Sequence, residues 1–206
     1  MSTPWTDVLW DAPRPDDAAV GQSLARLRLT AEAITAPATL QLLGSFNTMT
    51  INGVALGAAL RVDDVDEVGQ WFLSRNRFEE YGFVQRLLTS EALADALPDL
   101  VSDGPVRTTV EFEESSPLTL DGDIAQALLW RGGGAFTGTA AEAKRLGVAA
   151  SSELIGDRYE DFRVDTSDAP WSPWFGGICW DHTWAITDLR DQRVTLITIT
   201  DTDQVR

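Results

Sequence analysis

The single histidine of the chain, His182, has the side chain best suited to acid–base chemistry near neutral pH. It follows Asp181 directly, and a carboxylate can orient an imidazole that acts as a general base. In a strand, neighbouring side chains point to opposite faces, so the orienting carboxylate would have to come from elsewhere. A hydrogen-bonded histidine among aromatic side chains is the competing interpretation. No Gly-x-Ser-x-Gly nucleophile motif accompanies this histidine.

Two aspartates near the C-terminus, Asp201 and Asp203, have carboxylates that could bind a divalent metal ion. They share one face at the end of a predicted strand, and Mg²⁺ and Ca²⁺ prefer oxygen ligands. The Asp-x-Asp spacing alone is a weak signal, and the longer acidic frame of an EF-hand loop is absent. A solvated strand end is the alternative, so we expect no metal and no cofactor.

The charge balance is strongly acidic, because 32 Asp and Glu against 16 Lys and Arg give a net charge of −16. The negative electrostatic potential of such a chain disfavours binding to nucleic acids and anionic membranes, and it favours binding to cations and basic proteins. The acidic side chains cluster in three places, which we expect to bind the partner. These clusters contain Asp63, Asp64, Asp66 and Glu67, then Glu79 and Glu80, then Glu111 and Glu113.

Glu111 and Glu113 are predicted to share one face of a strand, with their side chains about 7 Å apart. Carboxylates at about this spacing on a rigid scaffold can imitate the phosphates along a DNA strand. The alternative is a solvated acidic surface that only promotes solubility.

Trp171 and Trp174 lie in a Pro-bounded loop rather than in a predicted helix or strand. Aromatic side chains gathered in this way either build a core or anchor a partner. Because loops run over the surface, we expect these two side chains to be exposed and to contact a partner.

The length of 206 residues and the hydrophobic content of 44% allow a sizeable core. A single cysteine, Cys179, excludes an internal disulfide framework and a zinc site with several thiolates. The first residues do not have the pattern of a signal peptide, and no apolar run has the length of a membrane span. We therefore expect a cytoplasmic globular protein.

The region 1–103 is predicted to be mostly helical, after an extended arm over 1–15. Apolar residues recur at helical spacing from Val20 to Ile34, and Pro37 is predicted to end this helix. Asn52-Gly53 predicts a loop that leads to another short helix. Short amphipathic helices are predicted over about 65–72, 83–88 and 91–97.

The turn Asp103-Gly104-Pro105 separates this region from 104–206, although the two regions can pack as a single domain. Alternation predicts a strand over 106–112, and helices are predicted from Asp121 to 130 and from Thr139 to about 154. The glycines 132–134 are predicted to form a helix end and turn. Alternating segments over 178–186 and 194–199 predict a closing antiparallel hairpin. The fold class is therefore α+β.

Residues 38–97 carry a short pattern that resembles a known family. It consists of Leu43-Gly44-Ser45-Phe46-Asn47, then Asn52-Gly53, then the apolar stripes of 65–72 and 83–88. The pattern is similar to the core of a family of small acidic helical bacterial proteins that includes a DNA-mimic protein. This resemblance implies an acidic binding role, in which carboxylates replace phosphates and occupy a DNA-binding regulator. Where the family has a second glycine and then an aromatic residue, this chain has Val54 and Ala55-Leu56.

Three functional hypotheses follow. The first is a non-enzymatic acidic protein that occupies a basic surface of a protein partner, as a DNA mimic or as an immunity protein that neutralises a cationic toxin. It binds neither nucleic acid nor membrane directly. The second is a metal-dependent or His-based hydrolase that uses Asp181, His182, Asp201 and Asp203. The third is an assembly component, such as a homodimer, joined through Trp171 and Trp174. We favour the first, because the sequence assembles no catalytic set.

Overall fold

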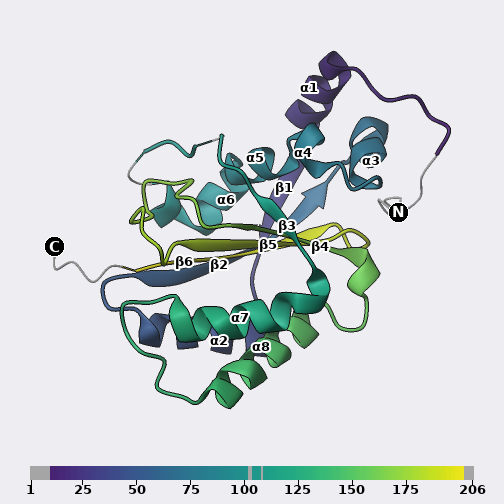
Figure 1. Ribbon diagram of the computed structural model, residues 1–206. Coiled ribbons are helices and arrows are strands. Elements are labelled where there is room, and N and C mark those ends of the chain that lie inside the picture. The colour runs from purple at the N-terminus through teal and green to yellow at the C-terminus, as the bar shows by residue number, and fades with distance from the viewer. Residues whose placement is uncertain (1–9, 102–103, 108, 202–206) are drawn as a thin grey trace.

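The computed structural model describes residues 10–101, 104–107 and 109–201 (Figure 1). The α-helices are α1 Asp17–Arg26, α2 Pro37–Met49, α3 Glu67–Leu73, α4 Phe78–Tyr81, α5 Phe83–Leu88, α6 Glu91–Ala96, α7 Leu120–Trp130 and α8 Ala140–Leu154. The 3-10 helices are η1 Pro98–Leu100, η2 Pro117–Thr119 and η3 Tyr159–Asp161. The strands are β1 Arg28–Glu32, β2 Val54–Asp63, β3 Glu113–Ser115, β4 Phe162–Ser167, β5 His182–Asp188 and β6 Arg193–Thr200. None of the helices in these residues is long and apolar enough to cross a membrane.

The six strands form one antiparallel sheet in the order β1-β2-β6-β5-β4-β3. Strands β1 and β2 come from the region 1–103, and the other four come from 104–206, so both regions contribute to the same sheet. Helices and antiparallel strands together confirm the predicted α+β class. Strands β1 and β3 form the two edges of the sheet.

Helices cover both faces of the sheet, because its central strands are apolar on both faces. On β5 and β6, Trp184 and Ile197 point to the layer of α2, α7 and α8. Ala185 and Leu196 point to the opposite layer, which contains α3 to α6. Figure 1 shows these two layers on either side of the sheet.

The predicted helix over 20–34 was wrong in its second part, and so was the predicted loop and short helix after Asn52. The first helix ends at Arg26, and two strands, β1 and β2, follow where a helix and a loop were predicted. Strand β2 is rich in alanine and glycine, which do not favour strands by themselves. Its pairing with β6 along Val54–Arg61 supplies the hydrogen bonds that stabilise the strand. Pro37 does not end a helix but is the first residue of α2, where its missing N–H costs nothing.

The predicted strand over 106–112 was also wrong, because β3 begins only at Glu113. Phe112 is buried, and Val106 and Val110 pack beside it against the core on the α3–α6 side of the sheet. The alternation of apolar residues therefore reflects contacts with that core rather than a place in the sheet. The boundary residue Asp103 lies outside the described residues.

Several other predictions are confirmed. Helix α8 begins after Thr139, whose side chain forms the predicted capping box with Glu142. Helix α7 ends at Trp130, with only Arg131 between it and the three glycines, and β5 and β6 form the predicted hairpin. These elements share strong local signals, such as caps and uninterrupted alternation.

A buried ion pair joins β4 to its surroundings on the α3–α6 side of the sheet. The guanidinium of Arg163 donates to Asp165 at 2.6 to 2.9 Å, to Glu114 of β3 at 2.9 Å and to Asn76 at 2.5 Å. Arg163 and Asp165 are both buried. Burial raises the pKa of Asp165, and the hydrogen bonds from Arg163 oppose that rise. Through Glu114 and Asn76, Arg163 therefore connects the β3 edge of the sheet to the turn between α3 and α4.

Replacement of Arg163 alone should destabilise the fold, because it leaves the carboxylate of Asp165 buried without a cation. We expect Arg163→Met to lower the free energy of unfolding by about 3 kcal/mol or more, measured by urea denaturation. The double variant Arg163→Met/Asp165→Leu should recover most of this loss, because it removes both charges. Arg145→Ala, at an exposed position, serves as the control and should change stability by less than about 0.5 kcal/mol. A double variant no more stable than the single one would contradict this interpretation.

The contact between α7 and α8 depends on a glycine in the middle of a helix. A Cβ atom at Gly147 would lie 2.2 Å from the carbonyl oxygen of Asp121. We expect Gly147→Ala to lower the free energy of unfolding by about 1 to 3 kcal/mol, although alanine favours helices. The matched control is Gly44→Ala in α2, where a Cβ would meet nothing within 4 Å. It should raise stability by up to about 1 kcal/mol. Equal effects of the two substitutions in urea denaturation would argue against close packing at Gly147.

Candidate functional site

A pocket of about 610 Å³ lies between α7 and the β3–β5 part of the sheet, and His182 lies in its wall. Antiparallel pairing places Glu113 and Trp184 opposite Thr166, so these three side chains share one face of the sheet. His182 lies two residues before Trp184 and points to the same face. Four side chains from three strands therefore form the sheet side of the pocket.

Helix α7 forms the other side of the pocket with residues spaced for one helical face. Asp123, Ala127, Trp130 and Arg131 all line the pocket and follow each other at intervals typical of one face. The helical rise separates Asp123 from Trp130 by about 10 Å along the axis. Trp130 is 72% exposed, whereas Trp184 at the opposite wall is 1% exposed. The helix thus carries an acidic residue at one end of the pocket and an aromatic residue at the other, and Arg131, directly after the helix, adds a cation there.

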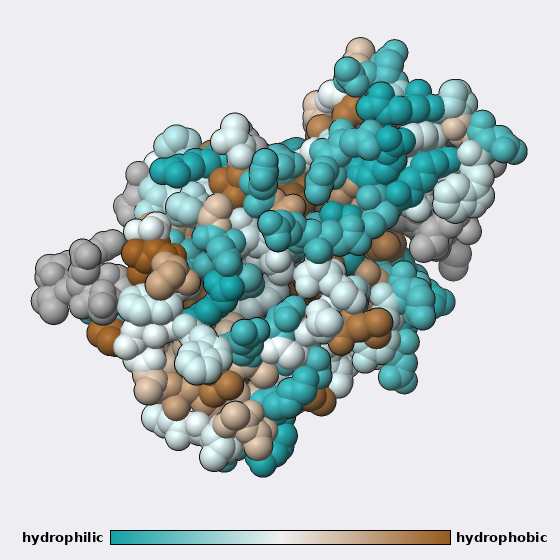
Figure 2. Space-filling view, viewed as in Figure 1, coloured by the Kyte–Doolittle hydropathy of each residue, from teal (hydrophilic) through white to brown (hydrophobic). Residues whose placement is uncertain are grey.

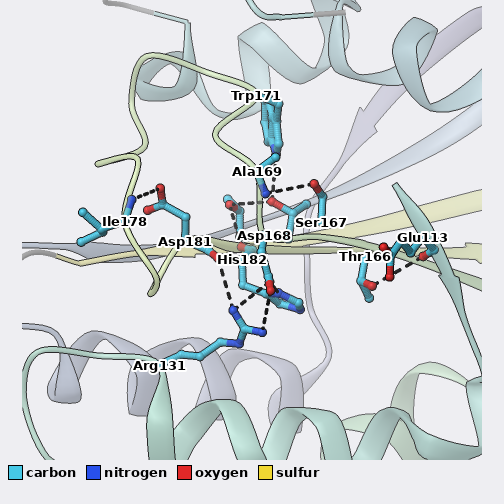
Figure 3. Close-up of polar contacts among 12 residues, drawn as sticks. Glu113, Arg131, Thr166, Ser167, Asp168, Ala169, Trp171, Ile178, Asp181 and His182 are labelled. Carbon is cyan, nitrogen blue, oxygen red and sulfur yellow. Dashed lines mark hydrogen bonds and ion pairs between the residues drawn. The ribbon is translucent and has the colours of Figure 1, made fainter. Parts of the chain in front are cut away.

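Asp168 is the carboxylate that binds His182, and it comes from the segment that follows β4. Its side chain hydrogen-bonds to Nδ1 of His182. Arg131 binds the same carboxylate at 2.8 Å and donates to the backbone carbonyl of Asp181 at 3.3 Å. Figure 3 shows Arg131 reaching Asp168 from the α7 side, next to the imidazole. The sequence correctly required a carboxylate from elsewhere, but it did not identify Asp168.

The pKa values of this group define its charges at neutral pH. The hydrogen bond from His182, together with Arg131, lowers the pKa of Asp168 to about 2. Burial lowers the pKa of His182, the hydrogen bond to Asp168 opposes this, and the charge of Arg131 adds to the lowering. His182 is therefore neutral at pH 7. Because an ionised carboxylate only accepts hydrogen bonds, Nδ1 carries the ring proton and Nε2 keeps a lone pair.

The predicted catalytic and metal-binding roles of Asp181 and Asp201 are not supported by their positions. Asp181 is buried and accepts hydrogen bonds from the N–H groups of Gly177 and Ile178 and from Thr200. It therefore holds a turn and does not pair with the side chain of His182.

Asp201 is also buried, which corrects the prediction of a solvated strand end. It accepts hydrogen bonds at 2.6 to 2.9 Å from the N–H groups of Ile51, Asn52 and Gly133. This carboxylate therefore joins the loop after α2 to the glycine turn after α7. The two segments lie close together, because a Cβ at Gly134 would lie 2.3 Å from the carbonyl oxygen of Met49. Asp203 lies outside the described residues. Within the described ranges, no three His, Cys, Asp or Glu side chains are grouped to hold a metal ion.

The predicted acidic clusters are distributed over opposite edges of the sheet. Glu79, Glu111 and Glu113 meet at the β3 edge, where they line a second pocket of about 600 Å³ together with Glu114. Glu111 and Glu113 line both this pocket and the one at His182, so they lie between the two. Both are exposed, although Glu111 lies before the strand rather than in it.

The other predicted acids lie away from this edge. Asp63, Asp64 and Asp66 line a pocket at the β1 edge together with four arginines, Arg26, Arg28, Arg61 and Arg86. Arg61 binds Asp63 at 2.9 Å, so part of this charge is compensated. Glu67 is exposed at the start of α3, and Glu80 pairs with Arg14 and Arg77.

The predicted exposure of Trp171 was wrong. This side chain is 0% exposed and donates a hydrogen bond from its indole N–H to Thr183 at 2.8 Å. Trp174 is half-buried and packs edge-on against Phe175. Figure 3 shows Trp171 and Arg131 on opposite sides of the sheet. The loop that carries these tryptophans covers the sheet, and the exposed tryptophan beside the pocket is Trp130.

Sequence reasoning also missed Asp123, Trp130, Arg131 and Asp168 as members of one site. The helical spacing of the first three was visible in the sequence and could have indicated a common face. Nothing in the sequence showed that this face lies opposite β5. Another feature visible only in the structure is the indole N–H of Trp184, which is buried without a hydrogen-bond partner in the described part of the chain.

His182 should titrate with a pKa below 6.5, and substitutions of its two neighbours should shift this pKa in opposite directions. Arg131→Gln removes a nearby cation and should raise the pKa, whereas Asp168→Asn removes the carboxylate and should lower it. NMR titration of the imidazole signals measures both shifts without ambiguity, because the chain has one histidine.

The same pKa difference affects stability. Between pH 6.5 and the lower pKa of the folded state, the unfolded chain binds more protons at His182 than the folded chain. The contribution of His182 to the free energy of unfolding should therefore decrease as the pH falls below 6.5. A native pKa above 6.5, or shifts of the same sign in both variants, would contradict this description of the site.

Comparison with known proteins adds no further assignment to this site. No protein-family model matches the chain, and neither a curated protein nor a solved structure matches it. The pocket at His182 and the charges at the β3 edge are therefore the features from which we infer a function.

Proposed function

We propose that the chain is a non-enzymatic binding protein that occupies a basic surface of a protein partner through its β3 edge. The observation that supports this most is the position of Glu111 and Glu113, which are exposed between two pockets. Asp123 lies in the wall of one pocket and Glu79 in the wall of the other. A cationic surface that approached β3 would meet carboxylates on both sides of the strand.

Two cations close to this edge are already paired. Arg131 binds Asp168, and Arg163 is buried with Asp165 and Glu114. In the described ranges, neither Glu111 nor Glu113 forms an ion pair with another residue of the chain. Figure 2 shows hydrophilic side chains over the surface where Figure 1 places α4 and β3. The uncompensated charge at this edge favours association with a basic partner.

Two finer forms of the proposal differ in the kind of basic protein. A DNA-binding regulator is favoured by the resemblance of residues 38–97 and by the neighbouring carboxylates of Glu111 and Glu113. A cationic toxin, neutralised by this chain as an immunity protein, is favoured by the net charge alone. The competition of DNA for the same partner distinguishes them. We also propose that the protein acts in the cytoplasm, where the exposed thiol of Cys179 stays reduced.

A His-based hydrolase is the second candidate, and the pairing of His182 with Asp168 favours it. A nucleophile in such an enzyme lies within hydrogen-bond reach of the base. Among the described residues, no Ser, Thr or Cys side chain forms a hydrogen bond with the ring of His182. Binding is therefore the better supported function.

Removal of the two exposed carboxylates at β3 should weaken binding to a basic protein. We expect Glu111→Gln/Glu113→Gln to raise the Kd for protamine, an arginine-rich protein, by about three- to tenfold, because each exposed ion pair contributes up to about 1 kcal/mol. Calorimetry at low and high salt provides the measurement, and binding of the wild type should weaken steeply with salt.

The matched control is Glu91→Gln/Asp95→Asn, which changes the net charge equally at two exposed positions of α6, away from β3. It should leave the Kd within about twofold of the wild type. Equal losses in both double variants would mean that binding follows net charge and does not use the β3 edge. The absence of binding at any salt concentration would contradict the proposed function itself.

A further inference from the structure

We infer that the β1 edge of the sheet pairs with the β1 edge of a second copy of this chain, so that two six-stranded sheets join into one across a two-fold axis. This inference goes beyond the proposed function and does not depend on it, because β3 lies at the opposite edge of the sheet. Three features of β1 support it: outward backbone groups without a partner, open space beside the strand, and a sequence that is complementary to itself when two copies run antiparallel.

The backbone groups that point outward from β1 belong to Leu29 and Ala31. Val62 of β2 donates its N–H to the carbonyl of Gln192, directly before β6, at 2.8 Å, so its backbone groups face β6. Successive residues of a strand turn these groups to opposite sides, so those of the residue before Val62 face β1, where the register places Thr30. Leu29 and Ala31 therefore face away from β2. In the described ranges, neither forms a backbone hydrogen bond with a segment on that outer side.

The space beside this strand is open. A pocket of about 980 Å³ lies along Arg28, Leu29 and Thr30, and residues 89–92 around the start of α6 also line it. The side chains of Arg28, Thr30 and Ala31 are exposed. Proteins usually protect an edge strand with a covering segment, a proline or charged side chains, and β1 has no proline and no charge in its three middle positions. A partner strand can therefore reach the outward backbone groups.

The sequence of β1 is complementary to itself in one antiparallel register. When Leu29 lies opposite Ala31 of the partner subunit, every outward N–H and C=O group of the two strands gains a hydrogen-bond partner. The same register places Thr30 on the two-fold axis and Arg28 opposite Glu32 of the partner subunit. Opposite charges at such directly facing positions stabilise a strand pair. Registers centred on Leu29 or on Ala31 place one of these charges opposite Thr30 instead.

The two charged side chains at the ends of β1 are available for this contact. Arg28 is exposed and, among the described residues, forms no ion pair. Glu32 is held by Arg193 at 3.1 Å and by Arg61 at 4.0 Å, and its carboxylate can accept further hydrogen bonds. Strand β3 differs, because pairing with its own copy around Glu114 would place two like charges opposite each other. The β1 edge therefore fits a second copy, and the β3 edge does not.

Sedimentation velocity of the full chain over a series of concentrations measures this association. A single pair of short strands makes a small interface, so we expect a weak, reversible dimer that forms between about 10 and 500 µM. Ala31→Pro should abolish the dimer because it removes an outward N–H, and it should leave the monomer folded because edge strands tolerate proline. The matched control is Ala140→Pro at the first position of α8, where proline is also tolerated. A wild type that stays monomeric over this range, or an Ala31→Pro variant that dimerises like it, would overturn the inference.

Charge variants test the register. Arg28→Glu should raise the Kd of the dimer about five- to twentyfold, because it places two carboxylates opposite each other at both ends of the strand pair. The control is Arg145→Glu at an exposed position of α8, which changes the net charge equally and should leave the Kd within about twofold. Equal losses in the two variants would mean that the association follows net charge, and would contradict the contact between Arg28 and Glu32.

A cysteine on the two-fold axis tests the register independently. In a Cys179→Ser background, Thr30→Cys places two thiols opposite each other, and an added oxidant should join them as a disulfide between the copies. Gln41→Cys, at an exposed position of α2, is the control and should cross-link much more slowly. Equal rates would overturn the register. Ala31→Pro should bind protamine like the wild type, so a failure of the dimer and a failure of binding at β3 are distinguishable.

Discussion

The structure depends on a sheet whose central strands are apolar on both faces. Strands β2, β5 and β6 direct aliphatic and aromatic side chains alternately to one side and the other, and water must be excluded from both. One helical layer would leave half of these side chains exposed. The chain therefore provides α2, α7 and α8 for one face, and α3 to α6 with the Trp171 loop for the other.

Toward the β3 edge, polar and charged side chains take the place of the apolar side chains of the central strands. Strand β4 carries a buried ion pair on one face, and on the other face Thr166 lies in the pocket wall. Helix α7 covers the sheet with Leu128 and its apolar neighbours but presents Asp123 and Trp130 to the pocket. The pocket thus lies where α7 and the sheet face each other with polar as well as apolar side chains. The exposed edge gathers carboxylates from segments far apart in the sequence.

Local signals predicted the elements that do not need a distant partner. The capping box of α8 and the alternation of β5 and β6 depend on residues close together in the chain, and both predictions are confirmed. Strand β2 has weak local preference and exists because β6 pairs with it, so the sequence indicated a loop and a helix there. The apolar alternation over 106–112 was misleading for a related reason, because its side chains pack against the core without joining the sheet.

By itself, the sequence determined the acidic charge, the α+β class and the presence of one imidazole that could not pair with its neighbour Asp181. These properties depend on composition and on the period of side chains along a strand. Only the tertiary structure decided that Asp168 and Arg131 meet at His182, that Trp130 rather than Trp171 is exposed, and that Glu111 and Glu113 lie between two pockets. Each of these outcomes depends on which segments pack side by side, and that is set by the burial of the whole sheet rather than by any local pattern.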